Sequence, residues 1–383
     1  MKKRIIIIGG FLGAGKTTAI LYMAKYFIRA GLKVGIVTND QGSQLVDAHF
    51  LRASSLETLS VEGGCFCCNF DEFTRKIAEL NRSKNIDILL AEPVGSCTDL
   101  IATVFKPILL GKTPAPDTFA NEFSLSPLSV AADPKRIKRL MMQEGAGEES
   151  TGEKGAGEES ALFPTEVNYL FDRQLQEANI IAINKCDTLP RDELGRIAEF
   201  IQNKYPGAMV LKVSAKTGEG LPEWMNLIAK SFFTAGKDMQ VDYEAYARAE
   251  AALGWLNAFY NIVSDKPADI NEKAKIFMEN ARAAFRTHKT EIAHLKCYCV
   301  GRNDFFKASI TGTGDELDVS AAMALPQKEI NFIINARANG SPELLKQICE
   351  EEINKVFCGF TIRNIHSENF RPSPPNPTYR ISM

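Results

Sequence analysis

The sequence is poor in the residues on which metal-storing and polyanion-binding proteins depend. Only four of its 383 residues are His, and they are scattered at His49, His288, His294 and His366, so no His-rich stretch is present to collect metal ions. Lys and Arg number 45 against 47 Asp and Glu, which gives a formal charge of −2. This lack of a basic excess argues against nucleic acid as a partner.

Long apolar runs are also missing. The N-terminal run at residues 5–8 has only four apolar residues, whereas a secretory signal needs about 7–15. No stretch approaches the roughly 20 apolar residues of a membrane span. We therefore expect no membrane association and a cytoplasmic location.

The nine Cys are not arranged as in a secreted scaffold. Three of them, Cys65, Cys67 and Cys68, fall within four residues. A secreted disulfide scaffold is shorter and has an even number of Cys. The pattern indicates thiols or metal ligands in a reducing compartment.

The first 235 residues alternate short apolar runs with helical patterns. Strands are expected at residues 4–8, 33–38, 86–91, 128–132, 180–183 and 209–213, and helices at 16–30, 71–81, 191–204 and 221–233. Apolar strands without alternation, separated by helices, indicate a parallel sheet that is covered on both faces. The sequence therefore predicts a doubly wound, mostly parallel α/β domain over residues 1–235.

The remaining segments have a different character. Residues 143–160 repeat GAGEES and contain no large apolar side chain, which predicts a flexible acidic insertion. Residues 240–370 are expected to form a smaller α+β domain, and residues 371–383, with four Pro, an extended or disordered tail. In the smaller domain, helices are expected at 241–263, 270–286 and 342–356, and strands at 291–300, 305–311, 330–336 and 360–365.

A phosphate-binding motif follows the first strand. Gly10-Phe-Leu-Gly-Ala-Gly15-Lys16-Thr17 matches G-x-x-x-x-G-K-[ST] between an expected strand and an expected helix. In such a loop the backbone N–H groups face the phosphates, Lys16 contacts the β- and γ-phosphates, and Thr17 ligates Mg²⁺. The predicted nucleotide-binding residues of this loop are Gly10, Gly13, Ala14, Gly15, Lys16, Thr17 and Thr18.

A base-recognition motif follows the strand expected at 180–183. The carboxylate of Asp187 in Asn184-Lys185-Cys186-Asp187 can accept hydrogen bonds from the two N–H donors of guanine, and adenine offers no such pair. Asn184 is expected to brace the loop, and the Lys185 stem to lie over the base. After the next strand, a backbone N–H of Ser214 or Ala215 is expected to meet the guanine oxygen. Together with the P-loop, this motif predicts GTP.

Two further loops are candidates for sensing the γ-phosphate. Glu92 ends a strand beside the P-loop and is expected to orient Mg²⁺ through water, and Gly95 to present its N–H to the γ-phosphate. Asp40 follows the preceding strand and is a candidate to reach the nucleotide or the attacking water. The alternative for both is an ordinary strand-to-helix loop. We list Lys16, Asp40, Glu92 and Gly95 as the predicted catalytic residues.

The segment Gly63-Gly-Cys-Phe-Cys-Cys68 is the most unusual feature of the sequence. Thiolates so close together suit Zn²⁺ or a similar ion, and three ligands leave a position open for exchange. Candidates for the fourth ligand are Glu62, Asp40, water or a client residue. Redox chemistry and simple packing are the alternatives. The flanking Gly favour an exposed loop.

These motifs, in this order, resemble those of the CobW-type GTPases, which are relatives of the hydrogenase and urease nickel-insertion GTPases. The resemblance rests on GFLGAGKTT, Asn-Asp-Gln-Gly, Gly-Gly-Cys-Phe-Cys-Cys, Glu-Pro-Val-Gly and Asn-Lys-Cys-Asp, and covers residues 1–235. It implies a slow, Mg²⁺-dependent GTPase that binds zinc or cobalt at Cys65, Cys67 and Cys68. It also implies delivery of the ion to a client metalloprotein, or support of cobalamin metabolism.

The sequence departs from the family in places, and three hypotheses follow. The family often has Asn-Glu-Phe-Gly where residues 39–42 stand, and a Thr or Ser pair in place of Pro93-Val94. The preferred hypothesis is a GTP-hydrolysing metallochaperone, with a homodimer as one candidate assembly. The second is a GTP-gated switch that assists a cobalamin-linked enzyme and has a structural Cys cluster. The third is an ATP-using kinase or transferase. For Cys297 and Cys299, half-buried strand packing is preferred over a shared ligand with His294.

Overall fold

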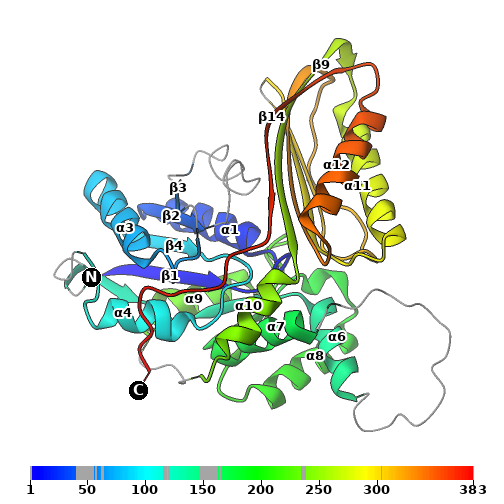
Figure 1. Ribbon diagram of the computed structural model, residues 1–383. Coiled ribbons are helices and arrows are strands. Elements are labelled where there is room, and N and C mark those ends of the chain that lie inside the picture. Colours follow the sequence, from blue (N-terminus) through cyan, green and yellow to red (C-terminus); the bar gives the residue numbers. More distant parts are fainter. Residues whose placement is uncertain are drawn as a thin grey trace.

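The chain forms two β-sheets, and each has its own covering helices (Figure 1). The structure is a computed structural model. It describes residues 2–39, 56, 58–61, 64–114, 119, 121–145, 163, 165–233, 239–302 and 304–382, without the side chains of 143–145. None of the helices in this described part is long and apolar enough to cross a membrane.

The first sheet has eight strands in the order β3-β2-β4-β1-β6-β7-β8, with β5 paired to β1, and neighbouring strands run parallel. The strands are β1 (Lys3–Gly9), β2 (Val34–Asn39), β3 (Thr58–Val61), β4 (Ile88–Glu92), β5 (Phe123–Leu125), β6 (Ser129–Ala132), β7 (Ile180–Ile183) and β8 (Met209–Lys212). Strands β2, β4 and β7 are buried along their whole length, as in a parallel sheet with both faces covered.

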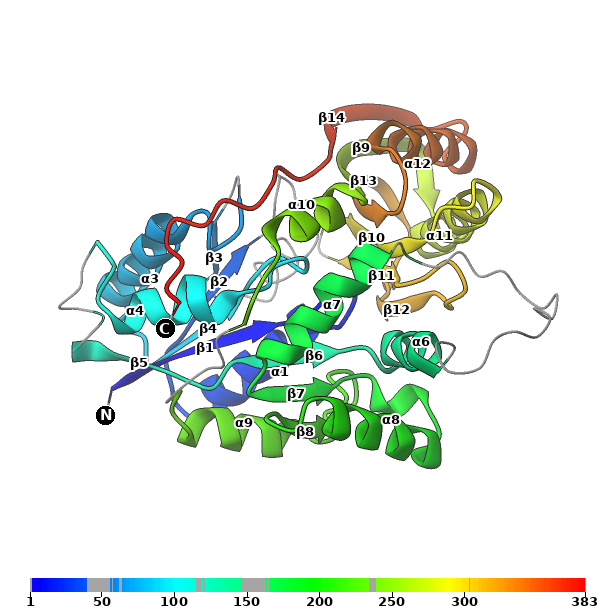
Figure 2. The ribbon, with the colours of Figure 1, turned by 60° about the horizontal axis from the view of Figure 1, so that its bottom comes forward.

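Helices cover both faces of this sheet (Figure 2). On one face, α1 (Lys16–Arg29) and α9 (Leu221–Lys230) share an apolar layer with the strands. On the other face the layer includes α3 (Phe70–Lys84), α7 (Thr165–Glu177) and α8 (Arg191–Lys204). The remaining helices of this part are η1 (Ile101–Phe105), α4 (Lys106–Leu109), α6 (Pro134–Gly145), η2 (Cys186–Thr188) and α10 (Tyr243–Ala251). The doubly wound α/β prediction is confirmed.

The second sheet is antiparallel and has six strands in the order β12-β11-β10-β13-β9-β14. The strands are β9 (Gly254–Ala268), β10 (Ile292–Val300), β11 (Phe305–Ile310), β12 (Asp318–Ala321), β13 (Gln327–Ala338) and β14 (Thr361–Phe370). Helices α11 (Ile270–Thr287) and α12 (Pro342–Val356) pack on one face and bury an apolar cluster against it. The predicted α+β character of the second domain is confirmed.

The helix predicted at 241–263 is wrong in its second half. Helix α10 ends at Ala251, and the chain continues as β9, which pairs with β13 on one side and with β14 on the other. The aromatic and β-branched residues at 255–263 favour a strand, and Gly254 lies too close to Gly340 for any side chain. Helix α10 itself packs against α7 of the first domain.

Two further predictions concern segments outside regular structure. Most of the predicted acidic insertion, residues 146–160, lies outside the described residues. The tail has no helix or strand over residues 371–382, but it runs along the first domain (Figure 1) and binds there through contacts described below.

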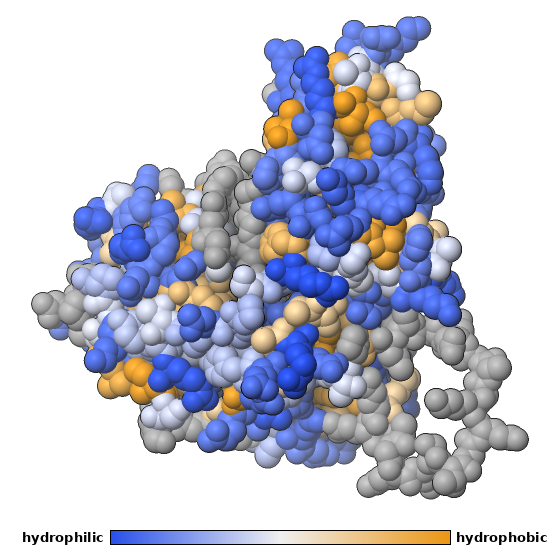
Figure 3. Space-filling view, in the orientation of Figure 1, coloured by the Kyte–Doolittle hydropathy of each residue, from blue (hydrophilic) through white to orange (hydrophobic). Residues whose placement is uncertain are grey.

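One face of the described molecule can be followed in Figure 3. On the face shown in Figure 3, apolar residues form small patches separated by hydrophilic ones over both domains. The described part of this face therefore presents no broad apolar surface. Functional residues have to be sought at the ends of the parallel strands.

Candidate nucleotide and metal sites

The P-loop follows β1 and leads into α1, which begins at Lys16. Gly10 and Gly15 have φ angles of 129° and 85°, which disfavour any residue with a side chain. A Cβ at Gly10 would lie 2.2 Å from the carbonyl oxygen of Ala131, and one at Gly15 would lie 2.3 Å from Nδ2 of Asn184. The loop is therefore wedged between β6 and the base-recognition loop.

Two buried side chains bring the P-loop and the end of β4 together. Thr17 Oγ1 donates a hydrogen bond to Glu92 Oε1 at 2.9 Å, and both residues are buried. Lys16 is also buried, and its ammonium donates to the carbonyl oxygen of Gly10 at 2.9 Å. A hydroxyl and a carboxylate beside a phosphate-binding loop are the hard oxygen donors that Mg²⁺ prefers. Thr18, in the same turn of α1, is exposed.

The loop after β4, residues 93–99, is called the β4 loop here. Gly95 lies against the P-loop, since a Cβ there would be 2.6 Å from Cδ2 of Leu12. Its carbonyl accepts a hydrogen bond from Nε2 of Gln174 at 2.9 Å. Both predicted β4 residues, Glu92 and Gly95, thus lie at the P-loop. Asp40 lies outside the described residues.

The base-recognition loop is held by Asn184. Its side chain donates to the carbonyl of Ala14 in the P-loop at 2.8 Å and accepts from the backbone N–H of Ala215 at 2.8 Å. Asn184 is buried, whereas Asp187 is exposed at the outer side of the loop. Ser214 is buried, and its hydroxyl accepts from the N–H of Thr217 at 3.1 Å. Asn184 thus joins the P-loop to the loop that contains Ala215.

The three clustered Cys lie on a turn at the start of α3, called the cysteine turn here (residues 64–69). The Cys65 Sγ lies 2.7 Å from the Cys67 Sγ and 3.1 Å from the Cys68 Sγ, and the last two sulfurs are 4.0 Å apart. Phe66 stacks on Phe73 of α3 with a centroid distance of 4.1 Å and anchors the turn. The expectation of an exposed loop is wrong for Cys65 and Cys67, which are 4% and 2% exposed. The apolar Phe66 between them pulls the turn into the core.

The thiols of the cysteine turn differ in pKa. Hydrogen bonds with the Cys67 and Cys68 sulfurs hold the pKa of Cys65 well below its usual range. The partnership with Cys65 raises the pKa of Cys68 to about 11. The turn also stands at the N-terminus of α3, whose dipole favours a thiolate. The hydrogen bonds and the helix dipole thus favour the thiolate form at Cys65.

The model of one protein family, the CobW/HypB/UreG nucleotide-binding domain, matches residues 4–212 of this chain. The chain belongs to this family. Its predicted family resemblance is thereby confirmed for the part that carries the P-loop, the cysteine turn and the base-recognition loop.

Curated relatives within the family carry zinc in their names. The chain is 26% identical over 246 residues to the zinc chaperone CobW of Pseudomonas aeruginosa, covering 60% of this chain and 61% of that protein. It is 23% identical over 303 residues to the zinc-regulated GTPase metalloprotein activator 1 of Dictyostelium discoideum, covering 75% of this chain and 58% of that protein. The chain thus spans about three fifths of the length of these relatives.

A solved relative extends over both domains. The zinc-bound YjiA GTPase of E. coli is 15% identical, with 94% of this chain and 99% of that chain covered. The TM-score of 0.35 is too low for its geometry to be transferred to this family member.

The C-terminal tail of this CobW/HypB/UreG-family protein binds over the cysteine turn. The backbone N–H of Asn376 donates to the Cys68 Sγ at 3.2 Å, and the N–H of Thr378 donates to the Cys67 carbonyl at 2.8 Å. Farther along, the guanidinium of Arg380 pairs with the buried carboxylate of Asp99 at 2.7 Å. Of the two alternatives expected for the tail, extended or disordered, the second is therefore wrong. Four Pro limit the freedom that the tail loses on binding.

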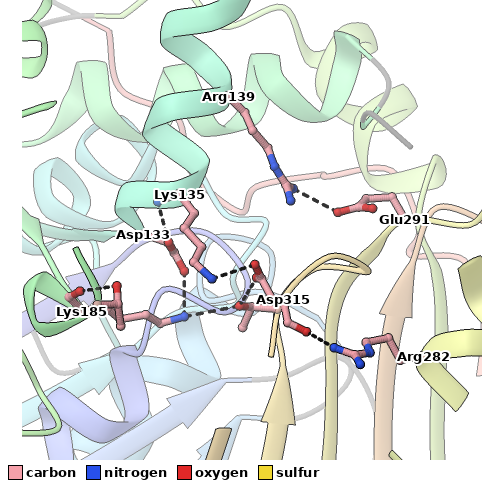
Figure 4. Close-up of polar contacts among 9 residues, drawn as sticks. Asp133, Lys135, Arg139, Lys185, Arg282, Glu291 and Asp315 are labelled. Carbon is pink, nitrogen blue, oxygen red and sulfur yellow. Dashed lines mark hydrogen bonds and ion pairs between the residues drawn. The ribbon is translucent and has the colours of Figure 1, made fainter. Parts of the chain in front are cut away.

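The second domain contacts the nucleotide edge. The Lys185 ammonium donates to Asp133 Oδ2 at 2.7 Å and lies 3.5 Å from the hydroxyl oxygen of Thr311 (Figure 4). That hydroxyl in turn donates to Asp315 at 2.9 Å, and Lys135 pairs with the same carboxylate at 3.0 Å. The Lys185 side chain expected over the base is thus held between the two domains.

These interdomain residues have no signal in the sequence. Thr311 also presses on the P-loop, because a Cβ at Gly13 would lie 2.7 Å from its Cγ2. A second ion pair, between Arg139 and Glu291 at 3.0 Å, closes the same interface (Figure 4). Asp133, Thr311 and Asp315 come from separate segments, so only the folded arrangement shows that they meet at the nucleotide edge.

The second Cys pair lies inside the second domain. Cys297 and Cys299 are 0% exposed on β10, and their sulfurs are 3.5 Å apart within the apolar cluster. Because side chains alternate along a strand, His294 points to the opposite face. The packing interpretation holds, although the pair is fully rather than half buried.

Proposed function

We propose that this protein is a Mg²⁺-dependent GTPase that binds zinc or cobalt at the cysteine turn and couples its nucleotide state to metal delivery. The observation that carries the proposal is the contact between the cysteine turn and the end of β2, where Thr38 pairs with Glu92 of β4. The amide of Asn39, at the end of β2, donates to the carbonyl of Gly64 at 2.6 Å, one residue before Cys65. A movement at the nucleotide edge therefore has a short path to the metal ligands.

The nucleotide side of the proposal assigns a role to each residue. Lys16 contacts the β- and γ-phosphates, Thr17 ligates Mg²⁺, and Glu92 orients the ion through water. The bond between Thr17 and Glu92 supports this, because it already places hydroxyl and carboxylate side by side. Bound Mg²⁺ would neutralise the charge that develops on the phosphates during hydrolysis. Gly95 would present its N–H to the γ-phosphate, and Asp40 would reach the nucleotide or its attacking water.

The base side of the proposal concerns GTP. Asp187 accepts the two guanine donors, and Asn184 keeps its loop fixed to the P-loop. The hydrogen bond from Asn184 to the carbonyl of Ala14 supports the assignment, because one side chain then positions the phosphate-binding loop and the base-recognition loop together. Comparing hydrolysis of GTP and ATP tests the assignment. We expect a strong preference for GTP, and an equal rate with ATP would contradict the base-site assignment.

The metal side concerns three thiols and one open position. Tetrahedral zinc with Zn–S distances of about 2.3 Å places its sulfurs roughly 3.8 Å apart. The distance of 4.0 Å between the Cys67 and Cys68 sulfurs fits this spacing, and the two shorter ones need a change of side-chain rotamer at Cys65. Soft thiolates favour zinc over Mg²⁺, so the two metals would occupy different sites.

The coupling is tested by measuring zinc affinity with a GTP analogue and with GDP at matched Mg²⁺. We expect the two affinities to differ, because the β4 loop contacts the P-loop at Gly95. Equal affinities would contradict the coupling. The names of the relatives support a client metalloprotein as the recipient of the ion. A reducing, cytoplasmic location accords with nine free thiols, and a homodimer is one candidate assembly.

The burial of Cys65 and Cys67 favours one second candidate. In it, the protein is a GTP-gated switch that assists a cobalamin-linked enzyme, and the cysteine turn is structural. Replacing Cys67 and Cys68 by Ser separates the two functions. Loss of client activation together with metal binding supports the metallochaperone, whereas preserved activation in a folded, metal-free variant supports the switch.

A further inference from the structure

The C-terminal tail binds the cysteine turn and the β4 loop at the same time. The backbone N–H of Asn376 donates to Cys68 Sγ at 3.2 Å, so the tail contacts a candidate metal ligand directly. The Thr378 hydroxyl donates to the Cys68 carbonyl at 2.9 Å. Two residues later, Nε of Arg380 donates to Asp99 Oδ2, at the end of the β4 loop, at 2.7 Å. One short segment therefore connects the two structures.

Asp99 is the anchor of the tail on the β4 loop. Its φ angle of 63° lies in the left-handed region, which residues with a side chain seldom adopt, and it is 2% exposed. A buried carboxylate needs hydrogen-bond partners and a counter-charge. The hydroxyl of Tyr243 donates to Asp99 Oδ2 at 2.8 Å, and the guanidinium of Arg380 supplies the charge. The tail is thus held at this point by a specific ion pair.

The other end of the β4 loop lies against the P-loop. A Cβ at Gly95 would be 3.0 Å from the backbone nitrogen of Leu12, so the two backbones are in contact. The side chain of Gln174 donates to the carbonyls of Gly95 at 2.9 Å and of Cys97 at 2.8 Å, and this ties the beginning of the loop to its middle. A displacement of Gly95 would therefore be passed along the loop to Asp99.

We propose that Asp99 and Arg380 are the positioning pair through which the β4 loop holds the tail over the cysteine turn, so that nucleotide state controls the exchange of the bound ion. This inference rests on the nucleotide and metal binding proposed above. A tail that only packed on the domain would need no more than apolar contacts, such as that of the Tyr379 ring with Phe70. The ion pair and the N–H donor at a sulfur add contacts at the two places that have to communicate.

The direct test measures how fast Zn²⁺ passes from the full chain, loaded with one equivalent, to an excess of a chelating dye. The rate is measured with a GTP analogue and with GDP at matched Mg²⁺, in the original chain and in Arg380→Gln. We expect the original chain to release zinc at different rates in the two nucleotides. Arg380→Gln should release it at one rate in both, at least about tenfold faster than the slower rate of the original chain, which corresponds to about 1.4 kcal/mol.

Three further variants show whether the pair itself is responsible. Arg371→Gln is the matched control, because the Arg371 guanidinium bonds to the Ala251 carbonyl and not to the β4 loop. Its release rates should equal those of the original chain. Asp99→Asn removes the charge and keeps a residue type that tolerates the left-handed conformation, so it should behave like Arg380→Gln. Arg380→Lys keeps the charge and should restore part of the nucleotide dependence.

The outcomes separate this inference from the proposed function. A nucleotide-dependent release rate that persists in a folded Arg380→Gln chain overturns the inference and leaves the proposed function intact. An equal change in Arg371→Gln does the same, because any loosening of the tail would then suffice. Equal release rates of the original chain in the two nucleotides also overturn the inference, and equal zinc affinities would contradict the proposed coupling as well. Failure of the original chain to bind zinc contradicts the proposed function, and this inference with it.

Discussion

Two Cys-x-Cys pairs, one in each domain, share their spacing and their burial but not their surroundings. In the first domain, Cys65 and Cys67 lie on a turn that brings Cys68 within 3.1 Å of Cys65. In the second, Cys297 and Cys299 lie on a strand whose neighbours are the apolar side chains of α11, α12 and the sheet. The spacing alone therefore does not decide whether two thiols form a ligand set.

The electrostatic settings of the two pairs also differ. Sulfur donors lower the pKa of Cys65, whereas burial raises that of Cys299 well above its usual value. A metal ligand has to be a thiolate. The turn stands at a helix N-terminus, whose dipole favours a thiolate, whereas the strand pair lies in an apolar cluster. The comparison teaches that backbone conformation and nearby donors, rather than exposure, mark the chemical site.

The largest effect is expected from variants that remove one pair of thiols at a time. Cys67→Ser with Cys68→Ser should abolish Zn²⁺ binding by the full chain. Cys297→Ser with Cys299→Ser should leave zinc stoichiometry unchanged but lower the free energy of unfolding, because each hydroxyl buried without a partner costs about 1–3 kcal/mol. Metal analysis and denaturant unfolding measure the two effects. Loss of zinc from the folded strand-pair variant would remove the distinction.

A second test uses Glu177, a buried acid beside the β4 loop. Burial raises the pKa of Glu177 to about 8, with Asp99 adding to the effect. Glu177 accepts hydrogen bonds from Thr98 and from the N–H of Ile101, just beyond Cys97. The folded protein favours the protonated form of Glu177. The contribution of this group to the free energy of unfolding is therefore complete below about pH 4.5 and is lost as pH rises through about 8.

The corresponding variant is Glu177→Gln, which cannot ionise. We expect its stability relative to the original chain to improve with pH by roughly 1.4 kcal/mol for each pH unit between about 5 and 8. Glu250, whose pKa burial also raises to about 8, contributes to the slope in both proteins, so the difference between them isolates Glu177. Urea unfolding at several pH values measures it. Parallel curves for the two proteins would contradict the assignment.

Motifs formed by neighbours in sequence were predictable in this molecule. Asn184 and Lys16 lie in short motifs whose geometry is local, and both side chains bond to the P-loop backbone. The helix predicted at 241–263 failed because short apolar runs do not distinguish strand from helix, and pairing with β13 decides. Thr311 meets Gly13 and Lys185 through contacts between distant segments, and no spacing within the chain records such contacts.

A third test separates the two pairs by their accessibility. Cys68 is half-buried beneath the tail, while Cys297 and Cys299 lie inside a sheet-and-helix core. Removing residues 376–383 takes away the hydrogen bonds of Asn376 and Thr378 to the cysteine turn. We expect Cys68 to be alkylated about tenfold faster, which corresponds to about 1.4 kcal/mol, or one to two net hydrogen bonds.

Mass spectrometry after timed alkylation locates the modified residue. Removing only residues 382–383 is the matched control, since it keeps both contacts to the cysteine turn. The strand pair should react at the same slow rate in all three proteins. Equal alkylation of Cys68 with and without the tail would show that the tail does not protect the turn.

The last variant tests whether the second domain, which contains the strand pair, acts on the nucleotide site. Its expected effect is the smallest. Thr311→Val keeps the shape that packs against Gly13 but removes the hydroxyl that lies 3.5 Å from the Lys185 ammonium. Lys185 then has one acceptor fewer within the protein and is freer to cover a base. A lost weak hydrogen bond of about 0.5 kcal/mol predicts a two- to threefold higher affinity for GDP. Thr313→Val, which removes a hydroxyl bonded to Glu291 rather than one near Lys185, is the matched control. Titration with a fluorescent GDP analogue measures both, and equal shifts in the two variants would mean that the second domain only packs beside the nucleotide edge.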